Sequence, residues 1–157
     1  LPASDKPMMT DLLDIRADET VLEIGTGLGY QAAILAELAR KVYSVEIIDE
    51  LAQRAIQRLK RQGYTNVEVR AGNGYTGWPK HAPFDKVIVT AAPDLIPPPL
   101  INQLRAGGRM VIPVGLPGAQ QLVVAEKDLN GRVTTKEIMP VLFSVLEESD
   151  QPAFRAS

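Results

Sequence analysis

The chain has 157 residues, 45% of them hydrophobic and 23% charged, which is enough for one domain with its own core and excludes a disordered protein. Its formal net charge of −2 lacks the basic excess of nucleic-acid-binding proteins, and no apolar run approaches the roughly 20 residues that span a bilayer. Cysteine is absent, which excludes disulfides, thiolate nucleophiles and zinc-cysteine sites and is compatible with a reducing compartment.

The first half of the chain alternates predicted strands with predicted helices. In chain order we expect a buried strand, a helix, an alternating strand rich in Val and Tyr, and a second helix, over residues 20–24, 30–40, 41–46 and 49–62. Asp49 is the expected N-cap of the second helix, and Gly63 is its expected stop. Strands over 67–71 and 85–90 enclose a glycine-rich turn at 72–77.

The second half begins with prolines and ends with a hairpin. Pro97–Pro99 open a helix that we expect to end at Gly107-Gly108, because proline favours helix starts and glycine favours helix ends. A strand over 109–114 follows, and then two strands, 121–127 and 132–139, joined through Asn130-Gly131, a strong hairpin signal. The pattern predicts an α/β fold with a doubly wound, mostly parallel sheet that closes with an antiparallel hairpin.

The stretch VLEIGTGLGYQ carries three glycines directly after the first predicted strand. The spacing Gly25-x-Gly27-x-Gly29 is one residue shorter than the dinucleotide fingerprint, and no Lys-Ser or Lys-Thr pair follows it, so a P-loop is excluded. No Lys or Arg lies between residues 17 and 39, so no cation near the loop is available for a phosphate. A tight turn without a ligand remains the alternative interpretation.

Glu46 ends the second predicted strand, 21 positions after Gly25. This is about the ~20-residue offset of a carboxylate that accepts the ribose hydroxyls of an adenosine. A charged residue that merely leaves a strand is the plainer alternative. Because the carboxyl ends of parallel strands meet at one edge, the glycine loop and Glu46 are expected to converge on one site.

The glycine loop, with Glu23 two residues before Gly25, resembles that of S-adenosylmethionine-dependent methyltransferases in general. A closer resemblance rests on the stretches MTDLL (9–13), VLEIGTGLGYQAAILAEL (21–38), VYSVEI (42–47), GNGYTGWP (72–79), APFDKVIVTAAP (82–93) and LINQLRAGGRMVIPVG (100–115). With these stretches the sequence, from about residue 9 to residue 146, resembles the protein-L-isoaspartate O-methyltransferase family. The run GWP, APFD and VTAAP is more specific to the family than the glycine loop. The resemblance implies the Rossmann-like class I methyltransferase version of the predicted fold.

The resemblance also implies roles for individual residues. Those that would bind S-adenosyl-L-methionine are Glu23, Gly25, Thr26, Gly27, Gly29, Glu46, Ile47, Asn73 and Gly74. Glu46 would take the ribose hydroxyls, Ile47 would pack on the adenine, and Asn73 stands where the family usually has an Asp that accepts from the adenine amino group. An Asn carbonyl can accept the same bond. Thr90, Ala91 and Ala92 would line the methyl-transfer site, and the tail over 140–146 resembles the family's final strand, near the substrate.

The start of the chain departs from the family pattern. The family carries a longer arm that ends in T-I-S-x-P and meets the acceptor carboxylate. Here Ser4 and Pro7 are the nearest candidates, and Ser4 precedes Met9 by five positions, a shorter spacing than in the family. We expect this arm to be shortened or differently aligned, and we carry Ser4 over as a catalytic residue with Thr90 and Ala91. Because the first residue is Leu1, we expect the natural N-terminus to have been removed, processed or left out.

Methyl transfer to a carboxylate needs no general base, since the acceptor is already ionised at neutral pH. We therefore expect no essential His and no metal site, and we expect His81 to be a solvated surface residue. Trp78 is either an adenine or peptide platform or a buried loop anchor. The acidic residues Glu147, Glu148 and Asp150 are expected to be exposed rather than catalytic.

These observations predict a cytoplasmic, monomeric, single-domain enzyme over residues 1–157 that methylates isoaspartyl residues in peptides or damaged proteins, without a nucleic-acid or membrane partner. A relative with another carboxyl or small-molecule acceptor is one alternative, and a cofactor-binding module without turnover is another. A dehydrogenase is disfavoured by the glycine spacing and by the VTAAP segment.

Overall fold

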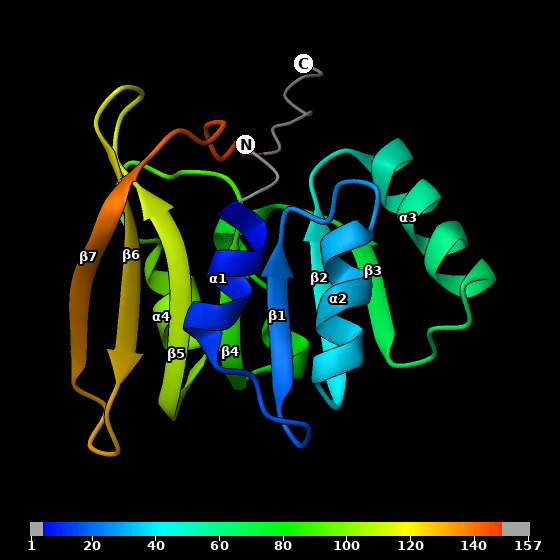
Figure 1. Ribbon diagram of the computed structural model, residues 1–157, viewed down its shortest axis with the longest axis horizontal. Helices are drawn as coiled ribbons and strands as arrows, with labels where there is room; N and C mark the ends of the chain where they lie inside the picture. The colour runs from blue at the N-terminus through cyan, green and yellow to red at the C-terminus, as the bar shows by residue number, and fades with distance from the viewer. Residues whose placement is uncertain (1–4, 149–157) are drawn as a thin grey trace.

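The computed structural model describes residues 5–148, and within them seven strands form one sheet in the order β3-β2-β1-β4-β5-β6-β7 (Figure 1). The strands are β1 (Thr20–Ile24), β2 (Lys41–Glu46), β3 (Val67–Ala71), β4 (Phe84–Val89), β5 (Leu104–Val114), β6 (Gln120–Lys127) and β7 (Val133–Val141). The helices are α1 (Asp5–Leu13), α2 (Tyr30–Leu38), α3 (Asp49–Arg61) and α4 (Pro98–Asn102), with single 3₁₀ turns η1 (Gly74–Thr76) and η2 (Pro79–His81).

The sheet is parallel from β3 to β5 and antiparallel from β5 to β7. The strand order reverses between β1 and β4, so a crevice opens at their carboxyl ends. Helices α1 and α2 lie on one face of the sheet and α4 on the other (Figure 1). The predicted α/β fold, doubly wound and closed by a hairpin, is confirmed.

The central strands are apolar on both faces because helices cover both. All five residues of β1 are buried, and their side chains divide between two core clusters, one holding Val21 with α1 and α2, the other holding Leu22 with α4. The carboxylate of Glu23 therefore lies at 0% exposure inside the central strand. A charged residue at that place needs polar partners, which the neighbouring strand supplies.

Several predicted boundaries need correction. Helix α3 is capped by Ile48 without a side-chain hydrogen bond, so Asp49 is its first residue and not its N-cap. Helix α4 ends at Asn102, and β5 runs on through Gly107-Gly108, which was predicted to stop the helix. A Cβ on Gly108 would lie 2.8 Å from the carbonyl oxygen of Asp85, so this glycine permits close strand packing instead of ending a helix.

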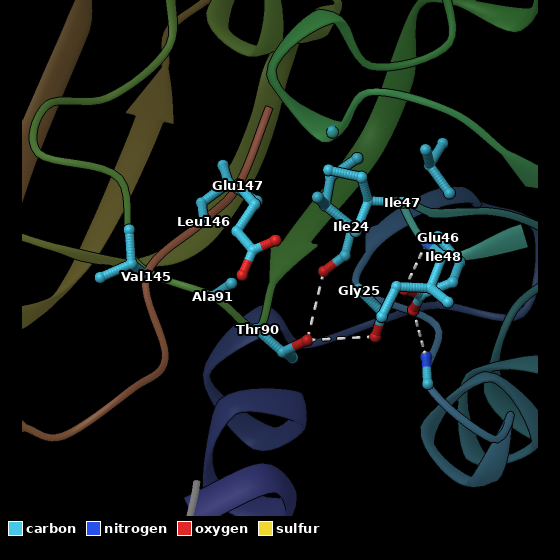
Figure 2. A pocket seen from close by; sticks show the side chains of 13 residues that line it. Ile24, Gly25, Glu46, Ile47, Ile48, Thr90, Ala91, Val145, Leu146 and Glu147 are labelled. Atoms are coloured by element: carbon cyan, nitrogen blue, oxygen red, sulfur yellow. Dashed lines mark hydrogen bonds between the residues drawn. The ribbon is translucent and has the colours of Figure 1, made fainter. Parts of the chain in front are cut away.

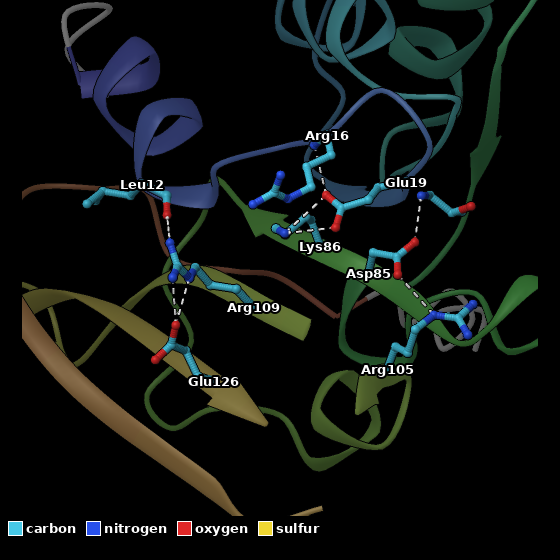
Figure 3. A network of polar contacts seen from close by, with 9 residues as sticks. Leu12, Arg16, Glu19, Asp85, Lys86, Arg105, Arg109 and Glu126 are labelled. Atoms are coloured by element: carbon cyan, nitrogen blue, oxygen red, sulfur yellow. Dashed lines mark hydrogen bonds and ion pairs between the residues drawn. The ribbon is translucent and has the colours of Figure 1, made fainter. Parts of the chain in front are cut away.

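Helix α1 was not predicted as a helix. It packs against β4 and β5, and its Met9 and Leu13, four positions apart, are fully buried. The end of α1 is held by Arg109 Nη1, which donates to the carbonyl oxygen of Leu12 over 2.7 Å (Figure 3). No helix within residues 5–148 is long and apolar enough to cross a membrane.

Candidate active site

A pocket opens at the carboxyl ends of β1, β2 and β4, where the strand order reverses (Figure 2). Seven residues predicted from the sequence line it: Gly25, Gly27, Glu46, Ile47, Gly74, Thr90 and Ala91. Six further lining residues were not named as site residues, although Val145 and Leu146 belong to the tail over 140–146 that the resemblance placed near the substrate: Ile24, Val45, Ile48, Val145, Leu146 and Glu147. The sequence prediction that the glycine loop and Glu46 converge is therefore confirmed.

The glycine loop fits tightly against the end of β4. Gly25 has a φ of +102°, and a Cβ there would lie 2.5 Å from Thr90 Oγ1, so no other residue fits without displacement. Gly29 caps α2 and packs on Ala55, and it is not among the residues that line the pocket. Of the three glycines, Gly25 and Gly27 therefore bring backbone to the pocket and Gly29 supports the helix behind them.

Glu46 is oriented by two backbone amides. Its Oε1 accepts from Gly27 N over 2.7 Å, and its Oε2 accepts from Ile48 N over 3.1 Å. A carboxylate has about four acceptor positions, so each oxygen retains one. Glu46 is 6% exposed and lines the pocket, which places a fixed bidentate acceptor at its wall. This geometry suits a vicinal diol.

Glu23, in β1, and Thr26, within the glycine loop, were both predicted to bind cofactor, and both are buried. Ser44 Oγ donates to Glu23 Oε1 over 2.5 Å and lies 2.5 Å from Thr26 Oγ1, and all three side chains are buried. Neither Glu23 nor Thr26 is among the residues that line the pocket, and their contact with a cofactor stays a prediction. Ser44 was missed; a serine at an inward position of the strand, two residues after Val42 and before Val45, was the available signal.

Thr90 and Ala91 directly follow β4 at the pocket, whereas Ala92 after them is buried and is not among the residues that line it. Thr90 Oγ1 lies 3.2 Å from the carbonyl oxygens of both Ile24 and Gly25, and its single proton can satisfy one of them. The hydroxyl therefore ties β4 to the glycine loop. Ser4, the third residue predicted to be catalytic, lies outside the described residues.

The wall beside Ala91 comes from the C-terminal segment. Val145 and Ala92 form a parallel bridge, which brings Val145, Leu146 and Glu147 to the pocket. Glu147 and Glu148 are exposed, as predicted. Glu147 also lines the pocket, and Figure 2 shows its carboxylate directed toward the middle of that pocket. Asp150 lies outside the described residues.

Asn73 and Gly74, although adjacent in sequence, line different hollows. Gly74 lines the pocket, whereas Asn73 lines a neighbouring groove, and its Oδ1 accepts from Tyr75 N over 2.9 Å to cap η1. The predicted bond from Asn73 to an adenine amino group would use the remaining lone pair of that oxygen. It stays a prediction.

The aromatic residues near η2 lie apart from the pocket lining. His81 was expected in solvent, but it is half-buried and stacks on Tyr43 with 4.1 Å between ring centroids, because η2 turns it onto β2. Trp78 packs edge-on against Tyr43 at 5.4 Å, and the Arg70 guanidinium lies 4.9 Å from its ring centroid. Burial lowers the pKa of Arg70. Trp78 thus anchors its loop.

The electrostatics of the pocket restrict its ligand. Of the described residues that line it, two are carboxylates and none is Lys, Arg or His. A nucleoside triphosphate or a dinucleotide would lack any cation for its phosphates here. The described residues also contain no group of three or more His, Asp or Glu that could hold a metal ion. The pocket suits a neutral or cationic ligand with an apolar ring and a diol.

The profile of the protein-L-isoaspartate(D-aspartate) O-methyltransferase family matches residues 4–151. The chain is 67% identical over 143 residues to protein-L-isoaspartate O-methyltransferase 1 of Polaromonas sp. strain JS666, covering 91% of this chain and 61% of that protein. It is 61% identical over 137 residues to protein-L-isoaspartate O-methyltransferase 2 of Syntrophobacter fumaroxidans, covering 87% of this chain and 56% of that protein. The chain thus spans less than two thirds of the length of these relatives.

Solved structures show the same fold. A protein-L-isoaspartate O-methyltransferase superposes with a TM-score of 0.84 at 28% identity, covering 90% of this chain and 46% of the other. A Plasmodium falciparum protein solved in complex with S-adenosyl-L-homocysteine superposes with a TM-score of 0.77 at 19% identity, covering 90% and 72%. The second likeness is evidence for the fold alone.

Proposed function

Because the chain belongs to the protein-L-isoaspartate(D-aspartate) O-methyltransferase family, we propose that it methylates the carboxylate of isoaspartyl residues in peptides or damaged proteins, with S-adenosyl-L-methionine as the methyl donor. The observation that carries the proposal is the pocket at the strand-order reversal. There a fixed carboxylate, Glu46, stands beside the backbone of Gly25 and Gly27, and none of the lining residues within 5–148 is a cation.

The pocket residues fit this cofactor. The two acceptor positions left on Glu46 match the ribose hydroxyls, and Val45, Ile47 and Ile48 supply apolar surface for an adenine. The lining carries negative charge, which suits a sulfonium cation and would repel phosphates. Glu23 and Thr26 would act on the methionine part through the loop that they support.

The chemistry requires alignment and little else from the protein. The cofactor supplies a methyl group on a positively charged sulfur. In the proposed transfer a carboxylate oxygen of the acceptor would form the bond to the methyl carbon as the carbon–sulfur bond breaks and the sulfur keeps that electron pair. Because the acceptor is already ionised at neutral pH, no proton has to move. Opposite charges disappear in the transition state, so a site partly closed to water favours the step. Thr90 and Ala91 would bound the space in which acceptor and methyl meet.

We further propose that residues 1–157 act as one domain, as a monomer in the cytoplasm, without nucleic-acid or membrane partners. Support comes from the absence of cysteine and from the net charge of −2. The edge strand β7 exposes Thr134, Thr135, Lys136 and Glu137, and charged edge strands resist pairing with a second copy. Light scattering after gel filtration measures the molar mass in solution, which should be that of one chain, 17.1 kDa.

The deciding experiment is methyl transfer from radiolabelled S-adenosylmethionine to two matched peptides, one with isoaspartate and one with ordinary aspartate. Base-labile label on the isoaspartyl peptide alone is the expected result. Label on both peptides would indicate a broader carboxyl specificity. Cofactor binding by calorimetry without label on either peptide would contradict the proposal and favour another acceptor or a binding module.

A further inference from the structure

The wall of the pocket beside Ala91 is an irregular segment, residues 143–147, that leaves β7 and crosses the carboxyl end of β4. Backbone bonds hold it at one place: Ala92 N donates to the carbonyl oxygen of Ser144 over 2.8 Å, and Leu146 N donates to that of Ala92 over 2.9 Å. Val145, between them, is 47% exposed and lines the pocket. The position of Val145 therefore also depends on the side chains that bind the segment before and after it.

Gln120 holds the beginning of the segment. Its Oε1 accepts from Phe143 N over 2.7 Å, and its Nε2 donates to the carbonyl oxygen of Phe143 over 3.1 Å. One amide side chain thus pairs both backbone groups of Phe143, as a neighbouring strand would. Gln120 is only 3% exposed, so water cannot readily replace either bond.

Tyr75 holds the other end. Its hydroxyl donates to the carbonyl oxygen of Leu146 over 3.1 Å. Burial and, to a lesser degree, the nearby carboxylates of Glu148 and Asp94 raise the pKa of this phenol, so it stays a donor at neutral pH. Tyr75 directly follows Gly74, which lines the pocket, and a Cβ on Gly74 would lie 3.4 Å from Leu146 Cδ1. Tyr75 therefore joins the loop after β3 to the C-terminal wall.

We propose that Gln120 and Tyr75 are positioning residues for the acceptor: by fixing Phe143 and Leu146 they set where Val145 and Glu147 stand beside Ala91. The inference rests on the proposed methyl transfer. The wall lies beside Thr90 and Ala91, and Figure 2 shows it across the pocket from Glu46 and Ile48. Loss of the Gln120 or Tyr75 hydrogen bonds should therefore weaken binding of the acceptor and leave cofactor binding at Glu46 unchanged.

The test uses Tyr75→Phe and Gln120→Met, each with a matched control. Tyr64→Phe removes a hydroxyl that donates to Glu37 far from the pocket lining, and Gln121→Met makes the same change one residue along β6. Kinetics with an isoaspartyl peptide at saturating cofactor give kcat and KM, and calorimetry gives the Kd of S-adenosylhomocysteine. We expect kcat/KM to fall about five-fold in Tyr75→Phe and at least ten-fold in Gln120→Met, mainly through KM, with the Kd within two-fold.

Three other outcomes overturn the inference in distinguishable ways. Unchanged kcat/KM in Tyr75→Phe and Gln120→Met, with an active parent chain, would remove the positioning role and leave the proposed function standing. A cofactor Kd that rises in step with the loss of kcat/KM would assign the wall to cofactor binding. A parent chain that methylates no isoaspartyl peptide would overturn the proposed function and this inference with it. If Gln120→Met does not fold, Tyr75→Phe alone decides, because it keeps the ring.

Discussion

At the scale of single residues, Glu46 is the most direct test of cofactor binding. In Glu46→Gln the amide NH₂ would face either Gly27 N or Ile48 N, both of which are donors, and the carboxylate charge would be lost. Hydrogen bonds to charged groups contribute about 1.5–3 kcal/mol, so the Kd of S-adenosylhomocysteine should rise roughly 10- to 100-fold by calorimetry. Glu137→Gln on the exposed edge strand is the matched control, and an equal effect there would contradict the assignment.

Gly25 tests the fit of the loop against β4. Gly25→Ala would place its Cβ 2.5 Å from Thr90 Oγ1, whereas Gly118→Ala, also at positive φ, meets nothing within 4 Å. The control should lose about 1 kcal/mol of unfolding free energy from backbone strain alone. Gly25→Ala should lose roughly 2–4 kcal/mol, since overpacking adds to the strain. Urea denaturation of both measures the difference, and similar losses would show that the Thr90 contact is easily relieved.

The site residues that could be predicted are those that a local sequence motif or a predicted strand end identifies. Gly25, Gly27 and Glu46 stand at the ends of neighbouring strands, and the rule for parallel sheets brings them together. Local pattern did not place Val145 or Glu147, because a single bridge to Ala92 brings them to the pocket from the far side of the hairpin. Only the family resemblance placed the tail over 140–146, which includes Val145, near the substrate. Pairing across such sequence separations leaves no local pattern.

At the scale of elements, the bounds of the first three strands were predicted better than the end of α4. Strands β1, β2 and β3 match their predicted bounds because each is a short segment rich in β-branched residues that begins directly after a polar residue: Glu19, Arg40 and Asn66. The prediction of the boundary between α4 and β5 was wrong because a Gly-Gly pair such as Gly107-Gly108 can either end a helix or permit close contact between strands. Sequence alone does not distinguish them, since the deciding contact is with Asp85 on another strand.

The pairing of β2 with β3 carries a pH-dependent contribution to stability. Lys41 Nζ lies 3.0 Å from Glu68 Oε2, and its hydrogen bond lowers the pKa of Glu68 below the usual value of 4.5. A lowered folded-state pKa means that the stabilisation is present above pH 4.5 and is lost as the pH falls through the folded pKa. Both side chains are partly exposed, so Glu68→Gln should cost at most about 0.5 kcal/mol at pH 7. Unfolding curves at pH 7 and at low pH check this; an undiminished cost in acid would contradict it.

At the scale of the whole molecule, the two ends of the sheet serve different purposes. The pocket lies at the carboxyl ends of the strands, whereas a polar network ties the amino ends of β1 and β4 (Figure 3). In that network Lys86 Nζ lies 3.0 Å from Glu19 Oε1, and Lys86 is only 8% exposed. Its ammonium therefore depends on one carboxylate, which lies at the far end of the strands from the site.

Glu19→Gln should consequently lower stability without changing the site. The substitution keeps an acceptor for Arg16 N but leaves the nearly buried Lys86 ammonium without its counter-charge, which should cost about 2 kcal/mol of unfolding free energy. Glu50→Gln is the control, because the Glu50–Arg54 pair is exposed on α3 and should contribute less than about 0.5 kcal/mol. Denaturant unfolding gives both losses, and calorimetry should give an unchanged Kd of S-adenosylhomocysteine for both variants. A Kd that rose in Glu19→Gln would mean that the amino-end network also sets the geometry of the pocket, because β1 and β4 carry Gly25 and Thr90 directly at their other ends.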